Sequence, residues 1–240
     1  MLSLLLSVVM FASFAGSPVD EVTPSTRYEG VAFDLKSNNM LYVEDHEELI
    51  ENGKRVGLKT SYCEPSGKVI VRRTVSFKQN ETVPTFQTED FRDGYLEGAE
   101  FRGDSVRHYC RKNYGSALKE KTILIPGPAA VDAGFNNVIQ RNWDDLMLGR
   151  KSQFNFGSPF ALDYYGFRVF KSDERIVDGR KLVVMQCEID NVIIRLFVSP
   201  IILTYDAASR RLVEYAGISN VNNEKGKSHF VRIKYSPFSP

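Results

Sequence analysis

The sequence contains few of the side chains on which metal and redox chemistry depends. Its 240 residues include only three cysteines, three histidines and one tryptophan. Three cysteines cannot build a disulfide scaffold, the usual support of a chain that lacks a hydrophobic core. A histidine-rich catalytic metal centre would require nearly every histidine of the chain. We therefore expect a globular domain stabilised by burial of its hydrophobic residues, which make up 42% of the sequence.

The sequence also lacks an excess of charge of either sign. Lys and Arg number 31 and Asp and Glu number 30, which gives a formal net charge of +1. Proteins that bind nucleic acid through a general basic field cluster Lys and Arg against the phosphates. We therefore expect no nucleic-acid partner.

An uncharged apolar segment opens the sequence. Residues 1–15, MLSLLLSVVMFASFA, are too few to cross a bilayer, which takes roughly 20 residues, but they fit the apolar region of a secretory signal peptide. Ser13 and Ala15 are small, as a cleavage site requires, so we expect export and cleavage after Ala15. The alternatives are a buried strand or an anchor helix. No later stretch reaches 18 apolar residues, so no transmembrane helix is expected in the mature chain.

Short runs of alternating apolar and polar residues dominate the remainder of the chain. Residues 16–26 are small and polar and predict a flexible leader, which leaves a single β-rich domain over 27–240. The alternation, broken by Gly, Pro, Asn and Asp, predicts antiparallel strands joined by tight turns. The predicted strands are 28–35, 40–49, 56–63, 68–78, 85–90, 95–101, 105–112, 120–125, 153–164, 166–171, 181–189, 192–198, 201–205, 211–218 and 228–235.

One segment in the middle of the chain has a helical period instead. Asp132 stands where an N-cap would and Gly149 where a C-cap would, which predicts one amphipathic helix at about 132–148. Its apolar face, at spacings of 4, 3, 1, 4, 3 and 1, comprises Val131, Phe135, Val138, Ile139, Trp143, Leu146 and Met147. The predicted fold is therefore mainly β, of the α+β kind. A large curved antiparallel sheet forms a barrel or half-barrel, and the helix packs over it.

Several stretches resemble a family of exported bacterial proteins of unknown function. They are Leu41–Glu48, Asp90–Gly98, Val131–Phe135, Asn142–Leu146, Leu203–Asp206, Arg210–Leu212 and Gly217–Val221. The resemblance covers nearly all of the mature chain and implies no known activity. From the signal peptide we expect a periplasmic location. The succession of strands and hairpins also resembles, more loosely, the periplasmic lipoprotein-carrier fold, an incomplete antiparallel barrel with helix packed over an apolar cavity. No binding residue of those carriers can be placed on this chain.

The predicted helix supplies the candidate site. The simplest interpretation of its apolar face is hydrophobic core. The functional alternative is that this face lines a cavity left by an unclosed sheet, because small-molecule sites are concave and largely apolar. The chain would then bind or carry an apolar or lipid-like ligand. The side chains of this hypothesis are Phe135, Val138, Ile139, Trp143 and Met147 beneath the helix, with Arg141 and Asp144 at the rim.

The case for an enzyme is limited to acidic clusters. Glu44, His46 and Glu48 would share one face of a strand and could hold a divalent cation, although a solvated face paired with Lys or Arg is commoner. Asp90–Glu97 could do acid–base work, although an Arg–carboxylate network that fixes a turn is preferred. The motifs G-x-S-x-G, H-E-x-x-H, C-x-x-C and G-x-G-x-x-G are absent from the sequence. We expect no catalytic residue, metal or cofactor, and keep an exported hydrolase or metal-dependent enzyme as the alternative function.

The three cysteines allow one disulfide in an oxidising compartment. Cys187 alternates with Val183, Met185 and Ile189, which is typical of a small buried side chain. Cys63 and Cys110 are therefore the candidate pair.

Overall fold

The computed structural model describes residues 25–196, 198–223 and 226–237. The predicted signal peptide, and the predicted leader as far as residue 24, lie outside these residues. The strands are β1 Ser25–Asp34, β2 Met40–Glu51, β3 Lys54–Cys63, β4 Val69–Ser76, β5 Thr85–Asp90, β6 Leu96–Phe101, β7 Ser105–Arg111, β8 Lys119–Leu124, β9 Ala129–Val131, β10 Ser152–Ser158, β11 Asp163–Val177, β12 Arg180–Ile189, β13 Ile201–Asp206, β14 Leu212–Asn222 and β15 Ser228–Tyr235. The helices are α1 Gly134–Arg141, α2 Trp143–Met147 and α3 Val192–Arg195.

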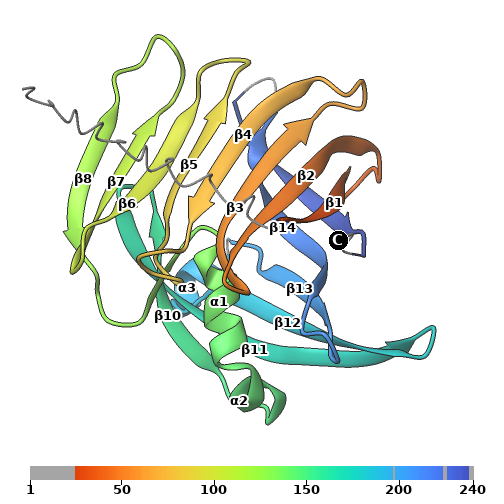
Figure 1. Cartoon of the computed structure of the whole chain (residues 1–240). Helices are drawn as coiled ribbons and strands as arrows, with labels where there is room; N and C mark the ends of the chain where they lie inside the picture. The colour runs from red at the N-terminus through yellow and green to blue at the C-terminus, as the bar shows by residue number, and fades with distance from the viewer. Residues whose placement is uncertain (1–24, 197, 224–225, 238–240) are drawn as a thin grey trace, which may run out of the picture.

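One curved sheet holds all of these strands. Their order is β8-β7-β6-β5-β4-β3-β2-β1-β15-β14-β13-β12-β11-β10-β9. Neighbouring strands are antiparallel, except that β9 runs parallel to β10. The sheet bends round so that α1 lies within its curve (Figure 1). The predicted mainly β fold, with a large curved antiparallel sheet, is confirmed.

Alternation along the strands decides which side chains face inward. In β4 the buried side chains of Val71, Arg73 and Val75 alternate with the exposed ones of Arg72 and Thr74. Successive side chains of a strand point to opposite faces, so the buried set lines the concave face of the sheet. A polar residue at an inward position, such as Arg73, must find its partners inside the molecule.

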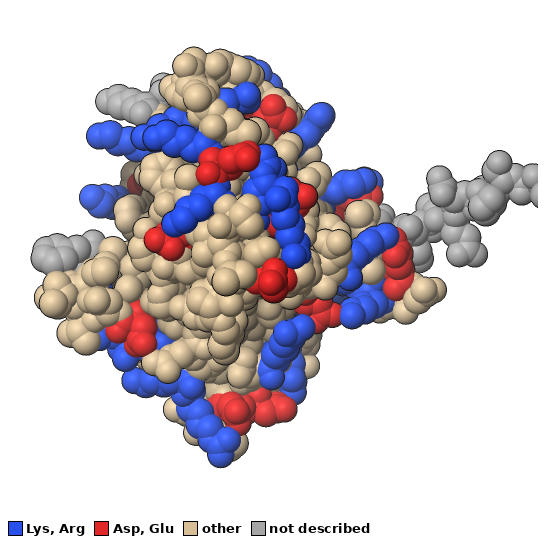
Figure 2. Space-filling view, turned by 90° about the vertical axis from the view of Figure 1, so that its left-hand side faces the viewer, with Lys and Arg blue, Asp and Glu red and all other residues tan. Residues whose placement is uncertain are grey.

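Three apolar clusters fill the inside of the curve. The first lies between α1, α2 and β10–β13, the second joins β3–β7 to β9, and the third lies between β1–β4, β14 and β15. Outside, Lys and Arg are interspersed with Asp and Glu over the face that Figure 2 shows, as the near-zero net charge would suggest. Among the described helices, none has both the length and the apolar character needed to cross a membrane.

The single helix predicted at about 132–148 is wrong in detail, because α1 and α2 are separate helices. The break is at Asn142, whose Nδ2 donates to the backbone oxygen of Val138 at 2.8 Å. A side-chain amide that competes for a helical carbonyl favours termination. Asp132 is not the N-cap, since its φ is +47° and its carboxylate is used elsewhere. Gly149 was predicted as the C-cap, but the C-cap of α2 is Leu148, and Gly149 follows it with φ +80°.

Two predicted strands are also wrong. Residues 192–198 were expected to form a strand, but α3 occupies 192–195. Its N-cap is Asn191, whose side-chain oxygen accepts from the backbone N–H groups of Ile193 and Ile194 at 3.0 and 3.1 Å. The strand predicted over 153–164 ends at Ser158, and β11 starts at Asp163.

Candidate functional site

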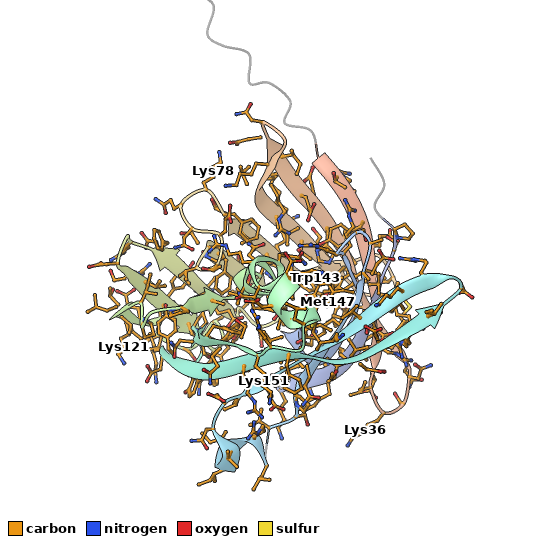
Figure 3. The ribbon with its side chains drawn as sticks, turned by 90° about the horizontal axis from the view of Figure 1, so that it is seen from below. Lys36, Lys78, Lys121, Trp143, Met147 and Lys151 are labelled. Atoms are coloured by element: carbon orange, nitrogen blue, oxygen red, sulfur yellow. The ribbon has the colours of Figure 1, made fainter. Side chains whose placement is uncertain are left out.

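The apolar undersides of α1 and α2 rest on the concave face of the sheet. Ile139 and Leu146 are fully buried, and Trp143 is 4% exposed. The Trp143 ring meets the Tyr205 ring of β13 edge to face, with centroids 5.5 Å apart. The structure thus brings Val138, Ile139 and Trp143 together against the sheet, with Phe135 and Met147 partly buried beside them. Figure 3 shows Trp143 and Met147 near the middle of the molecule, next to the ribbon of the sheet.

Polar contacts hold the margins of this helical segment. Arg141 Nη2 lies 2.9 Å from Glu81 Oε2, in the connection between β4 and β5. On the other side, Asp144 Oδ1 lies 3.0 Å from Arg210 Nη2, and the Arg210 guanidinium lies over the Trp143 ring at 5.5 Å. Arg141 and Asp144, the two residues of the rim hypothesis, each take part in an ion pair at the surface.

Further hydrogen bonds lie close to those ion pairs. Asn137 Nδ2 donates to the backbone oxygen of Glu81 at 2.6 Å, and Asn137 Oδ1 accepts from Arg55 at 2.7 Å. Gln140 donates to the backbone oxygen of Arg210 at 2.9 Å. Sequence reasoning missed Glu81 and Arg210, because no local pattern connects positions 60 or more residues apart.

A buried ion pair fixes the start of α1. Arg73 Nη2 of β4 lies 2.5 Å from Asp132 Oδ2, and both side chains are about nine-tenths buried. Arg73 also donates to the Tyr62 hydroxyl at 3.2 Å. Burial opposes the charge of Arg73, but Asp132, Tyr62 and Glu44 together outweigh it, so the pKa of Arg73 lies above its usual value. Sequence reasoning missed the buried position of Arg73, and the alternation along β4 is the signal that could have indicated it.

Glu97 of β6 belongs to the same polar interior. Its Oε2 accepts from the Tyr95 hydroxyl at 2.8 Å. Burial raises the pKa of Glu97 to about 7; the charge of Asp132 adds to the rise, while the Tyr95 hydrogen bond and the charge of Arg73 oppose it. Glu97 is therefore the carboxyl of this interior that changes charge near neutral pH.

Glu97→Gln is expected to flatten the pH dependence of stability. The folded pKa lies above the unfolded value of about 4.3, so the stabilisation that Glu97 provides is present below about pH 4 and is lost as the pH rises through about 7. Between pH 5 and 8 the wild type should lose about 1–3 kcal/mol more than the variant. Urea unfolding at several pH values measures this difference. Glu100→Gln, on the same strand but half exposed, is the control, and an unchanged slope in Glu97→Gln would contradict the assignment.

The acidic cluster of β2 forms side-chain hydrogen bonds and an ion pair with its neighbours. His46 Nε2 lies 2.9 Å from Glu44 Oε2, and His46 Nδ1 lies 2.9 Å from the Thr60 hydroxyl, with all three side chains buried. Glu48 is paired instead with Arg55 at 3.1 Å. Across the part of the chain that the structure describes, no three His, Cys, Asp or Glu side chains converge as metal ligands do.

The cluster between β5 and β6 is an Arg–carboxylate network. Arg92 Nε and Nη2 donate to the two carboxylate oxygens of Asp90 at 2.9 and 2.5 Å. Arg92 also donates to the backbone oxygen of Asn222 at 2.8 Å. The interpretation that these charges fix a turn is confirmed, because both oxygens of Asp90 are engaged by one guanidinium.

The disulfide predicted between Cys63 and Cys110 does not form. Cys63 lies on β3 and Cys110 on β7, and three strands separate them in the sheet. Both thiols are free and buried, as is Cys187. Burial raises the pKa of each of the three thiols, which disfavours the reactive thiolate.

Two hollows lie away from the helices. One of about 300 Å³ is lined by polar and charged side chains of β1–β4, among them Glu47, Lys59 and Arg72. The other, of about 450 Å³, is lined by Lys112, Phe160 and their neighbours. The underside of α1 and α2 is packed against the sheet, so a ligand there would have to displace protein side chains.

Comparison of this chain with known proteins gives a similarity of fold alone. No family model and no curated protein matches the sequence. One similar solved structure is a DUF1329 family protein from Desulfovibrio piger, with 12% sequence identity. The match covers 91% of this chain and 86% of that chain. Its TM-score of 0.24 is too low to indicate a common fold. A second crystal structure, from Brucella abortus, is 10% identical over 90% of this chain and 96% of its own, with a TM-score of 0.54. The chain is thus similar in fold to that structure, a β-barrel-like protein of the domain of unknown function DUF1849.

Proposed function

We propose that this protein is an exported binding protein that takes an apolar or lipid-like ligand between the α1–α2 segment and the concave face of the sheet. Export to the periplasm rests on residues 1–15, whose composition fits a signal peptide. Binding rests on one observation: an amphipathic helical segment covers an apolar concave sheet and has exposed polar contacts along both margins.

The two exposed ion pairs at the margins oppose release of the helices only weakly. The ion pairs Arg141–Glu81 and Asp144–Arg210 are exposed, and each such pair contributes about 0–1 kcal/mol. Lifting α1 and α2 would cost their apolar contacts with the sheet and the hydrogen bonds of Asn136, Asn137 and Gln140. An acyl chain that enters the same space restores apolar contact on both sides, so it can offset that cost.

The chemistry of the interface favours an apolar chain with a polar end. Aliphatic and aromatic side chains make up the interface, and the Tyr205 hydroxyl is already satisfied by Asn136 Oδ1 at 2.8 Å. A buried charge of the ligand would find no partner there. A charged end would instead lie at the rim, where Arg141 and Arg210 are exposed.

Trp143 makes the site directly observable, because it is the only tryptophan of the chain. Dibromostearate, whose bromines quench tryptophan by contact, is expected to quench Trp143, and unbrominated stearate is expected not to. Met147→Glu, which places a charge in the interface, should weaken binding by about tenfold or more, equivalent to about 1.4 kcal/mol.

Leu148→Glu is the matched control, since the neighbouring Leu148 side chain is 72% exposed and should leave binding unchanged. Circular dichroism of both variants checks that the fold is retained. Absence of bromine-specific quenching, together with absence of lipid in extracts of protein purified from its native cells, would overturn the proposed function.

A further inference from the structure

The larger of the two hollows lies at the β8 edge of the sheet, and we call it the β7–β8 hollow. Its volume of about 450 Å³ is in the range of small-molecule sites. The lining comes from the end of β7, the start of β8, the connection between them, and the connection between β10 and β11. The lining residues are Cys110, Lys112, Ser116, Ala117, Lys119 and Phe160. Two parts of the chain that are distant in the sequence therefore form its walls.

The pairing of β7 with β8 explains why lysines gather at this hollow. Cys110 lies directly opposite Lys119, and the next inward residue of β7, His108, lies opposite Lys121. Both lysines therefore share the face to which the buried side chains of β7 point. Lys112, the residue after β7, brings a second ammonium group to the lining. Figure 3 labels Lys121, which lies at the margin of the molecule on this side.

The lining of the β7–β8 hollow contains no carboxylate. Among the residues that the structure describes, Lys112, Lys119 and Lys121 take part in no ion pair. Glu120, between two of these lysines, points to the opposite face of β8 and pairs with Arg107. The other hollow, by contrast, has carboxylates among its lining. A cleft lined by charge of one sign concentrates the field and attracts an ion of the opposite sign.

The uncharged part of the lining limits the kind of anion. Phe160 is 60% exposed, and Lys112 Nζ lies 5.7 Å from the centre of its ring. The buried thiol of Cys110 adds apolar surface. The Ser116 hydroxyl already donates to Asn113 Oδ1 at 2.9 Å, so the two ammonium groups are the side-chain donors that remain. Two cationic donors beside an exposed aromatic ring suit an anion that carries a flat apolar body.

We propose that the β7–β8 hollow binds a small aromatic carboxylate, with its acid group at Lys112 and Lys119 and its ring system against Phe160. This goes beyond the proposed lipid-like ligand and does not depend on it, since no lining residue of the hollow belongs to α1 or α2. Both lysines are exposed, so the attraction is screened by salt, and the affinity falls as the ionic strength rises.

The test is isothermal titration calorimetry of the full chain with 2-naphthoate as the probe. The titration is made at about pH 6, because Glu97, which lies opposite Cys110 across β6 and β7, is mostly uncharged below its pKa of about 7. The expected dissociation constant is on the order of 0.1–1 mM. The neutral 2-naphthamide, which keeps the ring system, and acetate, which keeps the charge, should each bind at least about tenfold more weakly.

A pair of double variants tests the role of the lysines. Lys112→Gln with Lys119→Gln should weaken the binding of 2-naphthoate at least about tenfold, because the ammonium groups that hold the acid are lost. Lys36→Gln with Lys68→Gln is the matched control. It removes the same charge from two exposed lysines that line neither hollow, and it should change the affinity less than about twofold.

A second pair of variants tests the aromatic contact. Phe160→Ala should weaken binding of 2-naphthoate at least about fivefold, whereas Phe230→Ala, which removes an exposed ring of β15, should leave it unchanged. All substituted side chains of the hollow variants and their controls are at least partly exposed, except that Lys112, Lys119, Lys36 and Lys68 are fully in the exposed class. Circular dichroism confirms that each variant is folded.

Three outcomes would overturn the proposal. They are equal binding of 2-naphthoate and 2-naphthamide, equal losses in the two lysine double variants, and absence of binding at concentrations of several mM. Met147→Glu separates this site from the α1–α2 segment, since it should leave the binding of 2-naphthoate unchanged. Loss of 2-naphthoate binding in Met147→Glu, with binding retained in Lys112→Gln with Lys119→Gln, would place the probe under the helices and contradict a site in the hollow.

Discussion

Arg73→Met is expected to lower the free energy of unfolding by about 3–5 kcal/mol, because it leaves the carboxylate of Asp132 buried and unpaired. The variant also removes the donor to the Tyr62 hydroxyl. Since this ion pair joins β4 to the residue just before the α1 N-cap, the loss should loosen α1 and α2 and increase the solvent exposure of Trp143. Urea unfolding followed by circular dichroism gives the free energy, and the emission maximum of Trp143 reports the exposure.

Arg72→Met is the matched control for this substitution. Arg72 is the next residue of the same strand, but it is exposed on the outer face, where its guanidinium lies 5.5 Å from the centre of the Phe91 ring. Its loss should change stability by no more than about 1 kcal/mol. Asp132→Asn added to Arg73→Met should recover much of the loss, because the buried charge is removed and Asn tolerates the positive φ of +47°. Equal effects of Arg73→Met and Arg72→Met would contradict the role of the buried pair.

Gly134→Ala is expected to destabilise the protein by about 1–3 kcal/mol, although alanine normally favours a helix over glycine. A Cβ at this position would lie 1.9 Å from the backbone oxygen of Thr82 and 2.5 Å from its carbonyl carbon. The same oxygen accepts from the backbone N–H of Val131 at 2.9 Å, so it cannot retreat without losing that hydrogen bond. The first residue of α1 must therefore move away from the β4–β5 connection.

Thermal unfolding and Trp143 emission measure the effect of Gly134→Ala. Gly115→Ala is the control, because a Cβ there would meet only the Asn113 side chain, at 3.5 Å. A Gly134→Ala variant as stable as Gly115→Ala would show that the close packing of α1 against the Thr82 backbone does not contribute to stability.

Local patterns were sufficient to predict most of the strands. Alternation gave strands close to those observed, such as β2, β5 and β15, and Asp178-Gly179 marked a hairpin whose two residues have φ of +51° and +76°. The apolar face of the helical segment was also visible, since Ile139, Trp143 and Leu146 are all buried. These features depend on neighbours in the sequence.

What could not be predicted depends on competition or on distant partners. The break at Asn142 arises because its side-chain amide binds the carbonyl oxygen of Val138 in the helix. The apolar run after Asn191 fits a strand or a helix equally well, and only the capping hydrogen bonds of the Asn191 side chain favour the helix. The pair Arg73–Asp132 and the rim partners of Arg141 and Asp144 join positions about 60 residues apart. The separation of Cys63 from Cys110 follows from strand order, which alternation does not reveal.

The strand order has a further consequence for how the chain is assembled. Every pair of neighbouring strands is consecutive in the sequence, apart from β1 and β15, which meet in the middle of the sheet. The strands β8 and β9 are consecutive in the sequence, yet they form the two opposite edges. Apart from the parallel pair β9 and β10, the fold is thus two ribbons of local hairpins that share a single long-range seam. During synthesis, the edge of β1 that pairs with β15 stays unpaired until almost the whole chain has been made. The pairing of β1 with β15 is therefore the last to form, and until then this edge can pair with other chains.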